Sequence, residues 1–195
     1  MTTISKTISK NRSEAIPVFI SKISAILYEL GMPDSQFKME LNTSNSFLSN
    51  GTDELELLFS ANKGMKPGLI KKMASGGEMS RIMLAVKAVL AQSVHLPTII
   101  FDEIDTGVSG EVALKMGEIM NEMSGKMQVF AITHLPQIAA KGNQHYKVFK
   151  NESNGIVSSE IKQLSAEERV LEIAEMLSGK NITDSALAHA RTLLN

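Results

Sequence analysis

Several features that would mark particular classes of protein are missing or scarce in this sequence. Its 195 residues include no cysteine and no tryptophan, and the formal net charge is only −1. The absence of cysteine excludes a disulfide framework and cysteine-based zinc sites, and it fits a reducing cytoplasm. A chain this close to neutral has no overall basic surface for nucleic acid, so any DNA contact must be local or lie in other parts of the protein.

Long apolar runs are lacking as well. No segment approaches the roughly 20 apolar residues that a membrane span requires, and residues 1–17 do not have the apolar centre of a signal peptide. The hydrophobic content of 43% is still sufficient for one domain with a sizeable core.

The first part of the chain has the periodicity of a helix followed by two strands. Apolar residues at helical spacing predict a helix over 13–30, with Gly31 as its C-cap. Strict alternation predicts half-buried strands over 36–41 and 54–59.

The second part alternates helices and strands. Helices are expected over 79–90 and 111–124, and the apolar runs 98–102 and 127–132 predict strands buried on both faces. A strand, helix and strand in succession indicate a parallel crossover, so we expect an α/β region.

A hairpin and two helices are expected to end the chain. Strands over 146–150 and 156–161 flank Asn154-Gly155, a strong turn signal. Helices are predicted over 166–178 and 184–193.

The first candidate site is Ser75-Gly76-Gly77-Glu78, at the start of an amphipathic helix. Glycines at a helix N-terminus let backbone N–H groups face an anion. Ser followed three residues later by Glu is also a common capping pattern, and this simpler interpretation is favoured by the motif alone.

The second candidate site is Asp102-Glu103, at the end of an apolar strand. Ligands of open α/β sheets collect beyond the carboxyl ends of the strands. An aspartate there can hold Mg²⁺ and a glutamate can activate a water, although the pair could also mark a solvated strand end.

Two further groups follow along the chain. Residues 105–110 read alone as an ordinary turn with Ser109 as a helix N-cap, and His134 follows the next apolar strand. A lone histidine is more often structural or solvated, as we expect for His95 and His145. His134 differs because of its neighbours, and its place at a strand end would let it reach a terminal phosphate.

Taken in order, these groups resemble the head of ABC-type ATPases. Residues 75–78 resemble the signature motif, 98–103 the Walker B strand, 105–110 the D-loop and His134 the switch histidine. The resemblance implies an α/β fold, the C-terminal lobe of an ABC-type head. Such a lobe has a parallel sheet core with flanking helices, an antiparallel hairpin and an N-terminal helix that is a coiled-coil remnant.

The same resemblance implies roles for individual residues. Asp102 would act on Mg²⁺, and the catalytic residues would be Glu103, as general base, and His134. Asp105 would contact the partner subunit across a dimer. The nucleotide-binding set would be Ser75, Gly76, Gly77, Glu78, Asp105 and Gln137.

Within this superfamily the flanking residues resemble the RecN family of SMC-like proteins. The similar stretches are 29–33, 59–64, 73–81 and 133–139. The resemblance implies an ATPase of DNA double-strand break repair and recombination, with ATP and Mg²⁺ as cofactors. It also implies a homodimer of ATP-sandwiched heads, DNA ends or single-stranded regions as partners, no membrane partner, and a cytoplasmic, nucleoid-associated location.

A phosphate-binding loop of the form G-x-x-x-x-G-K-[ST] is not found. Ser124-Gly125-Lys126 and Ser178-Gly179-Lys180 are incomplete matches and are expected to be helix C-caps. We therefore expect residues 1–33 to be a coiled-coil end entering the head, and residues 34–195 to be its C-terminal half. The N-terminal half of the head would be a partner, and this chain alone should bind ATP weakly.

Two alternatives stay open from the sequence. One is the nucleotide-binding subunit of an ABC transporter, against which the helix over 13–30 and the flanking stretches argue. The other is a non-enzymatic dimerisation module of the same fold, suggested by the missing phosphate loop.

Overall fold

A computed structural model describes residues 2–94, 96–153 and 156–195. The chain divides into two compact units, Met1–Leu96 with Thr106–Val108, and Pro97–Asp105 with Ser109–Asn195. His95 and the turn Asn154-Gly155 lie outside the described residues. None of the helices in the described ranges combines the length and the apolar character of a membrane span.

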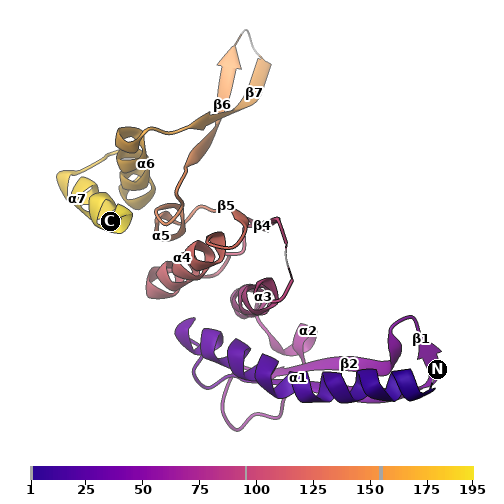
Figure 1. The fold of residues 1–195 in the computed structure, drawn as a ribbon. Coiled ribbons are helices and arrows are strands. Elements are labelled where there is room, and N and C mark those ends of the chain that lie inside the picture. Colours follow the sequence, from indigo (N-terminus) through magenta and orange to yellow (C-terminus); the bar gives the residue numbers. More distant parts are fainter. Residues whose placement is uncertain (1, 95, 154–155) are drawn as a thin grey trace. The chain divides into compact units, whose positions relative to one another are not determined.

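The first unit is a long helix packed along an antiparallel hairpin, with a second helix completing the core (Figure 1). Its elements are α1 (Thr2–Glu29), β1 (Gln36–Leu48), β2 (Gly51–Ser60), β3 (Gly68–Leu69), α2 (Ile70–Met73) and α3 (Gly76–Ala91). The pairing of β1 with β2 runs in register from Gln36↔Ser60 to Thr43↔Asp53. The buried core is made by Ile23, Leu27, Met32, Phe37, Phe59, Ile82, Ala85 and Val89.

The helix α1 begins eleven residues earlier than its apolar periodicity predicts, at Thr2 instead of residue 13. Its early turns are held by polar contacts with the tip of the hairpin. The Ser9 hydroxyl donates to Asp53 at 2.6 Å, and the Arg12 guanidinium donates to the same carboxylate at 2.7 Å. The hydrogen bonds from Ser9 and then Arg12 hold the pKa of Asp53 below its usual value.

The end of α1 is the expected glycine cap. Gly31 has a φ of +74°, in the left-handed region that glycine adopts without strain. The Met32 N–H donates to the Leu27 carbonyl at 2.9 Å, and the Gly31 N–H donates to the Tyr28 carbonyl at 3.2 Å. This pair of bonds satisfies two carbonyls at the helix end, as in the Schellman motif.

The second unit contains a parallel strand pair, an antiparallel hairpin and four helices in its described residues. Its elements are β4 (Thr98–Asp102), α4 (Gly110–Ser124), β5 (Gln128–Ile132), α5 (Pro136–Ala139), β6 (Tyr146–Ser153), β7 (Ile156–Gln163), α6 (Ala166–Ser178) and α7 (Asp184–Leu194). Strands β4 and β5 pair in parallel from Thr98↔Gln128 to Asp102↔Ile132, which confirms the expected crossover.

The expectation that β4 and β5 are buried on both faces is wrong for this chain. Ile99 and Phe101 are buried, but their neighbours on the other face are not. Ile100 is 61% exposed, Phe130 45% and Ile132 56%. Both apolar runs do form strands, but these three side chains remain exposed because none of the described residues covers them.

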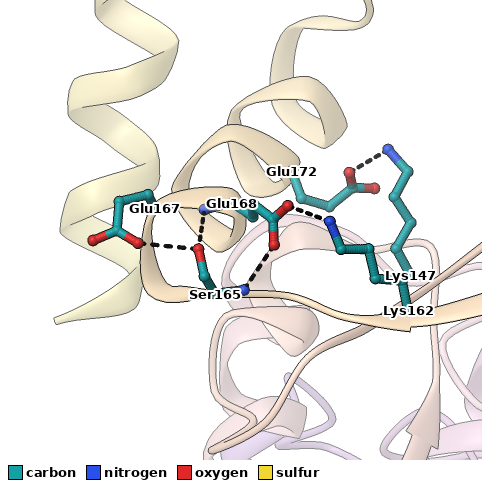
Figure 2. A network of polar contacts seen from close by, with 6 residues as sticks. All are labelled: Lys147, Lys162, Ser165, Glu167, Glu168 and Glu172. Carbon is teal, nitrogen blue, oxygen red and sulfur yellow. Dashed lines mark hydrogen bonds and ion pairs between the residues drawn. The ribbon is translucent and has the colours of Figure 1, made fainter.

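The hairpin β6–β7 is fixed to α6 by ion pairs, drawn in Figure 2. Lys147 of β6 pairs with Glu172, and Lys162 of β7 pairs with Glu168 at 2.5 Å. Glu168 also accepts from the Ser165 N–H at 2.9 Å, which ties the start of α6 into the same network. The hydrogen bond to Glu172 raises the pKa of Lys147 above its usual value, so this ammonium stays charged.

The helices α6 and α7 pack on each other and on the end of α5 through small and aliphatic residues (Figure 1). The buried residues of this cluster are Ala140, Ile173, Ala174, Ala186 and Ala190. Gly125 and Gly179 are the C-cap residues of α4 and α6, which confirms that the two incomplete phosphate-loop matches are helix ends.

Candidate functional site

The parallel pairing of β4 with β5 brings the acidic pair and the histidine to one edge of the sheet. Asp102 lies opposite Ile132 at the carboxyl ends of the two strands. The Glu103 N–H then donates to the Ile132 carbonyl at 3.1 Å, so the pairing extends one residue beyond β4. Thr133-His134 follows β5 directly. This edge is where open α/β sheets place their ligands.

Glu103 has an unusual backbone. Its φ is +47°, the only positive φ of a non-glycine residue in the described part of the chain. For an L-residue this conformation is unfavourable by about 1–2 kcal/mol. Strain of this kind persists where the surrounding structure enforces it, and it clusters at functional sites. Here it turns the chain sharply at the end of the strand and leaves Glu103 at the exposed edge.

Asp105 is a buried residue. Its side chain is 1% exposed, and Oδ2 accepts a hydrogen bond from the Thr133 hydroxyl. The Nδ1 atom of His134 lies 3.5 Å from the same oxygen. The other oxygen, Oδ1, is buried and has no hydrogen-bond partner among the described residues. The contact with a partner subunit that the resemblance implies for Asp105 stays a prediction.

Residues 133–135, which follow β5 and are called the switch segment below, are held in place through Thr133. The Thr133 Oγ1 accepts from the Leu135 N–H at 3.0 Å while its hydroxyl proton goes to Asp105. His134, between them, is 69% exposed. Sequence reasoning did not select Thr133 as a functional residue. The only feature of the sequence that could have pointed to Thr133 is its place beside His134, at the end of an apolar strand.

The signature-like residues lie in the first unit, at the N-terminus of α3. The Ser75 N–H donates to Glu78 Oε2 at 2.7 Å, so the capping interpretation is supported. Ser75 and Gly76 are exposed, and a side chain added at Gly76 would meet open space. A Cβ added at Gly77 would lie 2.8 Å from the Gly107 carbonyl oxygen. Gly77 is therefore required for close backbone packing, while Ser75 and Gly76 remain open to a ligand.

The candidate residues are thus divided between the two units. Asp102, Glu103, Asp105 and His134 come together in the second unit, where Gln137 lies partly buried on α5. Residues 75–78 belong to the first unit. His145, expected to be structural or solvated, is partly buried, and burial followed by the nearby Arg169 charge lowers its pKa.

The described residues contain no group of three or more acidic, histidine or cysteine side chains able to hold a metal by themselves. Asp102 supplies a single exposed carboxylate at the sheet edge. Mg²⁺ is commonly held by one or two carboxylates together with waters and substrate phosphates. The donor set therefore fits an ion that arrives with a nucleotide.

Solved structures show a fold similar to that of this chain. The chain resembles the Smc head domain of Pyrococcus yayanosii, with a TM-score of 0.69 and 20% identity, over 91% of this chain and 32% of that one. A chain from a study of ATP-driven dimerization and DNA stimulated activation of SMC ATPases matches with a TM-score of 0.57 and 21% identity, over 88% of this chain and 98% of that one. The fold is that of an SMC-type head segment.

Sequence comparison makes the assignment more specific. The chain is 41% identical to the DNA repair protein RecN of Deinococcus radiodurans over 181 residues, 93% of this chain and 31% of the relative. It is 43% identical to RecN of Rickettsia prowazekii over 168 residues, 86% of this chain and 30% of the relative. No family model matches. Over most of its length the chain is similar to RecN proteins, and it spans about a third of the length of the curated relatives it matches.

Proposed function

We propose that this chain supplies part of the ATP-hydrolysing head of a RecN-type DNA repair protein. The observation that carries the proposal is the shared edge of β4 and β5. Asp102 and Glu103 end one strand there, and His134 follows the adjacent strand. Relatives with the RecN name cover nearly all of this chain, and none of these likenesses favours a transporter subunit.

The edge residues have distinct proposed roles. Asp102 would hold Mg²⁺, which when bound with ATP would neutralise phosphate charge. Glu103 would act as the general base that orients and deprotonates the attacking water. His134, exposed beside them, would contact the terminal phosphate through its imidazole. Phosphoryl transfer depends mainly on such positioning and charge stabilisation.

The signature residues would serve a second nucleotide site. Ser75, Gly76, Gly77 and Glu78 stand at a helix N-terminus, where N–H groups and the helix dipole favour an anion. They would bind the γ-phosphate of ATP held by the opposite subunit, with Gln137 as a further nucleotide contact. One solved relative in fold comes from work on ATP-driven dimerization of SMC ATPases, which supports a head homodimer here.

The remaining parts of the head would come from other segments of the full-length protein. These would provide the phosphate-binding loop and cover the exposed β4–β5 face made by Ile100, Phe130 and Ile132. We propose residues 1–33 as a coiled-coil end and residues 34–195 as the C-terminal half of the head. The proposed protein is cytoplasmic and nucleoid-associated and acts on DNA ends or single-stranded regions, and the relatives' name, DNA repair protein RecN, supports the action on DNA.

The proposal is tested by Glu103→Gln in a full-length RecN protein that carries this sequence. Loss of the general base should lower kcat by about 10²- to 10⁴-fold while ATP still binds. Glu122→Gln, at an exposed position on α4, is the matched control and should leave turnover unchanged. Turnover of the Glu103 variant within a fewfold of the unmodified protein would exclude Glu103 as the base.

A further inference from the structure

Asp105 is a buried carboxylate beside an otherwise exposed site. Its side chain is 1% exposed, whereas Asp102 and Glu103 on the same turn are exposed. Burying an ionised group is unfavourable unless hydrogen bonds or opposite charge compensate for the lost water. The groups that surround Asp105 should therefore explain why an aspartate is kept there.

The first of these groups is the Thr133 hydroxyl, which connects Asp105 to the backbone of the switch segment. It donates to Oδ2 of Asp105 and accepts from the Leu135 N–H at 3.0 Å. Residues on both sides of His134 are thereby fixed relative to the carboxylate. This arrangement sets the backbone from which the imidazole projects.

The second group is the imidazole itself. Nδ1 of His134 lies 3.5 Å from Oδ2, and Oδ1 is buried without a partner among the described residues. An ionised carboxylate accepts hydrogen bonds and cannot donate one. The nitrogen beside it is therefore favoured as the protonated nitrogen of the ring. Because the side chain is 69% exposed, Nε2 on the other side of the ring is left for a ligand.

We infer that Asp105 is the positioning residue of His134. Its carboxylate holds Nδ1–H on the protein side of the ring and fixes the segment 133–135 through Thr133. Nε2 is then the atom that contacts the ligand. It accepts a hydrogen bond when the ring is neutral and donates one when the ring is protonated. The identity of that ligand as a terminal phosphate rests on the proposed function, but the orientation of the ring does not.

The orientation is tested on this chain without nucleotide, by ¹⁵N NMR of its histidine rings at a pH where they are neutral. His134→Gln identifies the signals of His134. The expected result is a protonated Nδ1 and an unprotonated Nε2. A proton on Nε2 in the unmodified chain would overturn the inference, and this measurement needs no variant of Asp105.

The cause of the orientation is tested by Asp105→Asn, whose amide can donate a hydrogen bond to Nδ1 and so permits the other tautomer. The proton should move largely to Nε2. Asp34→Asn, at an exposed position in the first unit, is the matched control and should leave the spectrum of His134 unchanged. An unchanged tautomer in the Asp105 variant would show that another group orients the ring.

The functional consequence is measured on the complete head. Asp105→Asn should lower kcat for ATP hydrolysis by about ten- to hundredfold, more than it changes KM, because it disturbs the orientation of a group that acts in the reaction. An unmodified head without ATPase activity would contradict the proposed function, and the NMR result would still decide the role of Asp105. Normal kcat in a variant with the altered tautomer would show that ring orientation is not used in catalysis.

Discussion

Two of the sheets formed by the described residues, the one that contains β1 and β2 and the β4–β5 pair, differ in how much apolar surface they bury. The β1–β2 hairpin packs against α1, and Phe37 and Phe59 are fully or almost fully removed from solvent. In the β4–β5 pair only Ile99 and Phe101 of β4 are buried, no residue of β5 is, and Ile100, Phe130 and Ile132 are exposed. The first sheet thus contributes large side chains to a buried core, whereas the β4–β5 pair buries fewer and carries the candidate site residues at one edge.

The largest expected effect contrasts one phenylalanine from each sheet. Phe59→Ala removes a fully buried ring and should lower the free energy of unfolding by about 3–5 kcal/mol. Phe130→Ala, at a position 45% exposed, should lower it by no more than about 1 kcal/mol. Urea unfolding of both variants measures the difference. Equal losses would show that the β4–β5 face is covered in solution.

A smaller effect separates the two glycines of the signature motif. Gly77→Ala places a Cβ against the Gly107 carbonyl, and overpacking of this kind should destabilise the chain by about 1–3 kcal/mol. Gly76→Ala meets open space at the start of α3 and should be neutral or stabilising by up to about 1 kcal/mol. Thermal unfolding compares them. Equal unfolding temperatures of the two variants would contradict the close backbone packing at Gly77.

Relief of the strain at Glu103 should change stability by less. Glycine adopts a φ of +47° freely, so Glu103→Gly should raise the free energy of unfolding by about 0.5–1 kcal/mol after the entropy of glycine is subtracted. Glu111→Gly, in the first turn of α4, should instead lower it by about 0.5–1 kcal/mol. Denaturant unfolding of the two variants measures the two changes in the free energy of unfolding, which should have opposite signs. A loss of stability in Glu103→Gly would mean that the backbone is not strained there.

The smallest effect is a pH dependence in the second unit. Burial lowers the pKa of His145 below its usual value of 6.5, so below about pH 6.5 the unfolded chain binds a proton that the folded chain does not. The free energy of unfolding should therefore fall as the pH drops from about 6.5 towards the folded pKa. Well above pH 6.5, this group should cause no change in stability. His145→Gln should flatten that part of the stability curve. If the slope of stability against pH is the same in this variant, the pH dependence must come from other groups.

Regular elements with strong apolar periodicity were predicted accurately. Strand β4 and helix α6 have the expected bounds, and the glycine caps at Gly31, Gly125 and Gly179 are where they were expected. These features depend on neighbouring residues in the sequence, such as apolar spacing and backbone conformations that glycine favours.

Features that depend on distant residues were not predictable. The early turns of α1 are held by Ser9 and Arg12 through Asp53, a polar contact that hydrophobic periodicity cannot detect. The sequence of β4 and β5 is that of buried strands, so their bare face becomes visible only in three dimensions. The burial of Asp105 against Thr133 joins residues 28 positions apart, and the turn sequence alone gave no sign of it.

The most direct test of the proposed function combines this chain with a segment that carries the phosphate-binding loop of the same head, and measures ATP hydrolysis with and without DNA. Each part alone should be nearly inactive, and the mixture should hydrolyse ATP at a rate that Glu103→Gln in this chain abolishes. A stable mixture that binds ATP without hydrolysing it, or one whose activity survives Glu103→Gln, would contradict the assignment of catalysis to the β4–β5 edge.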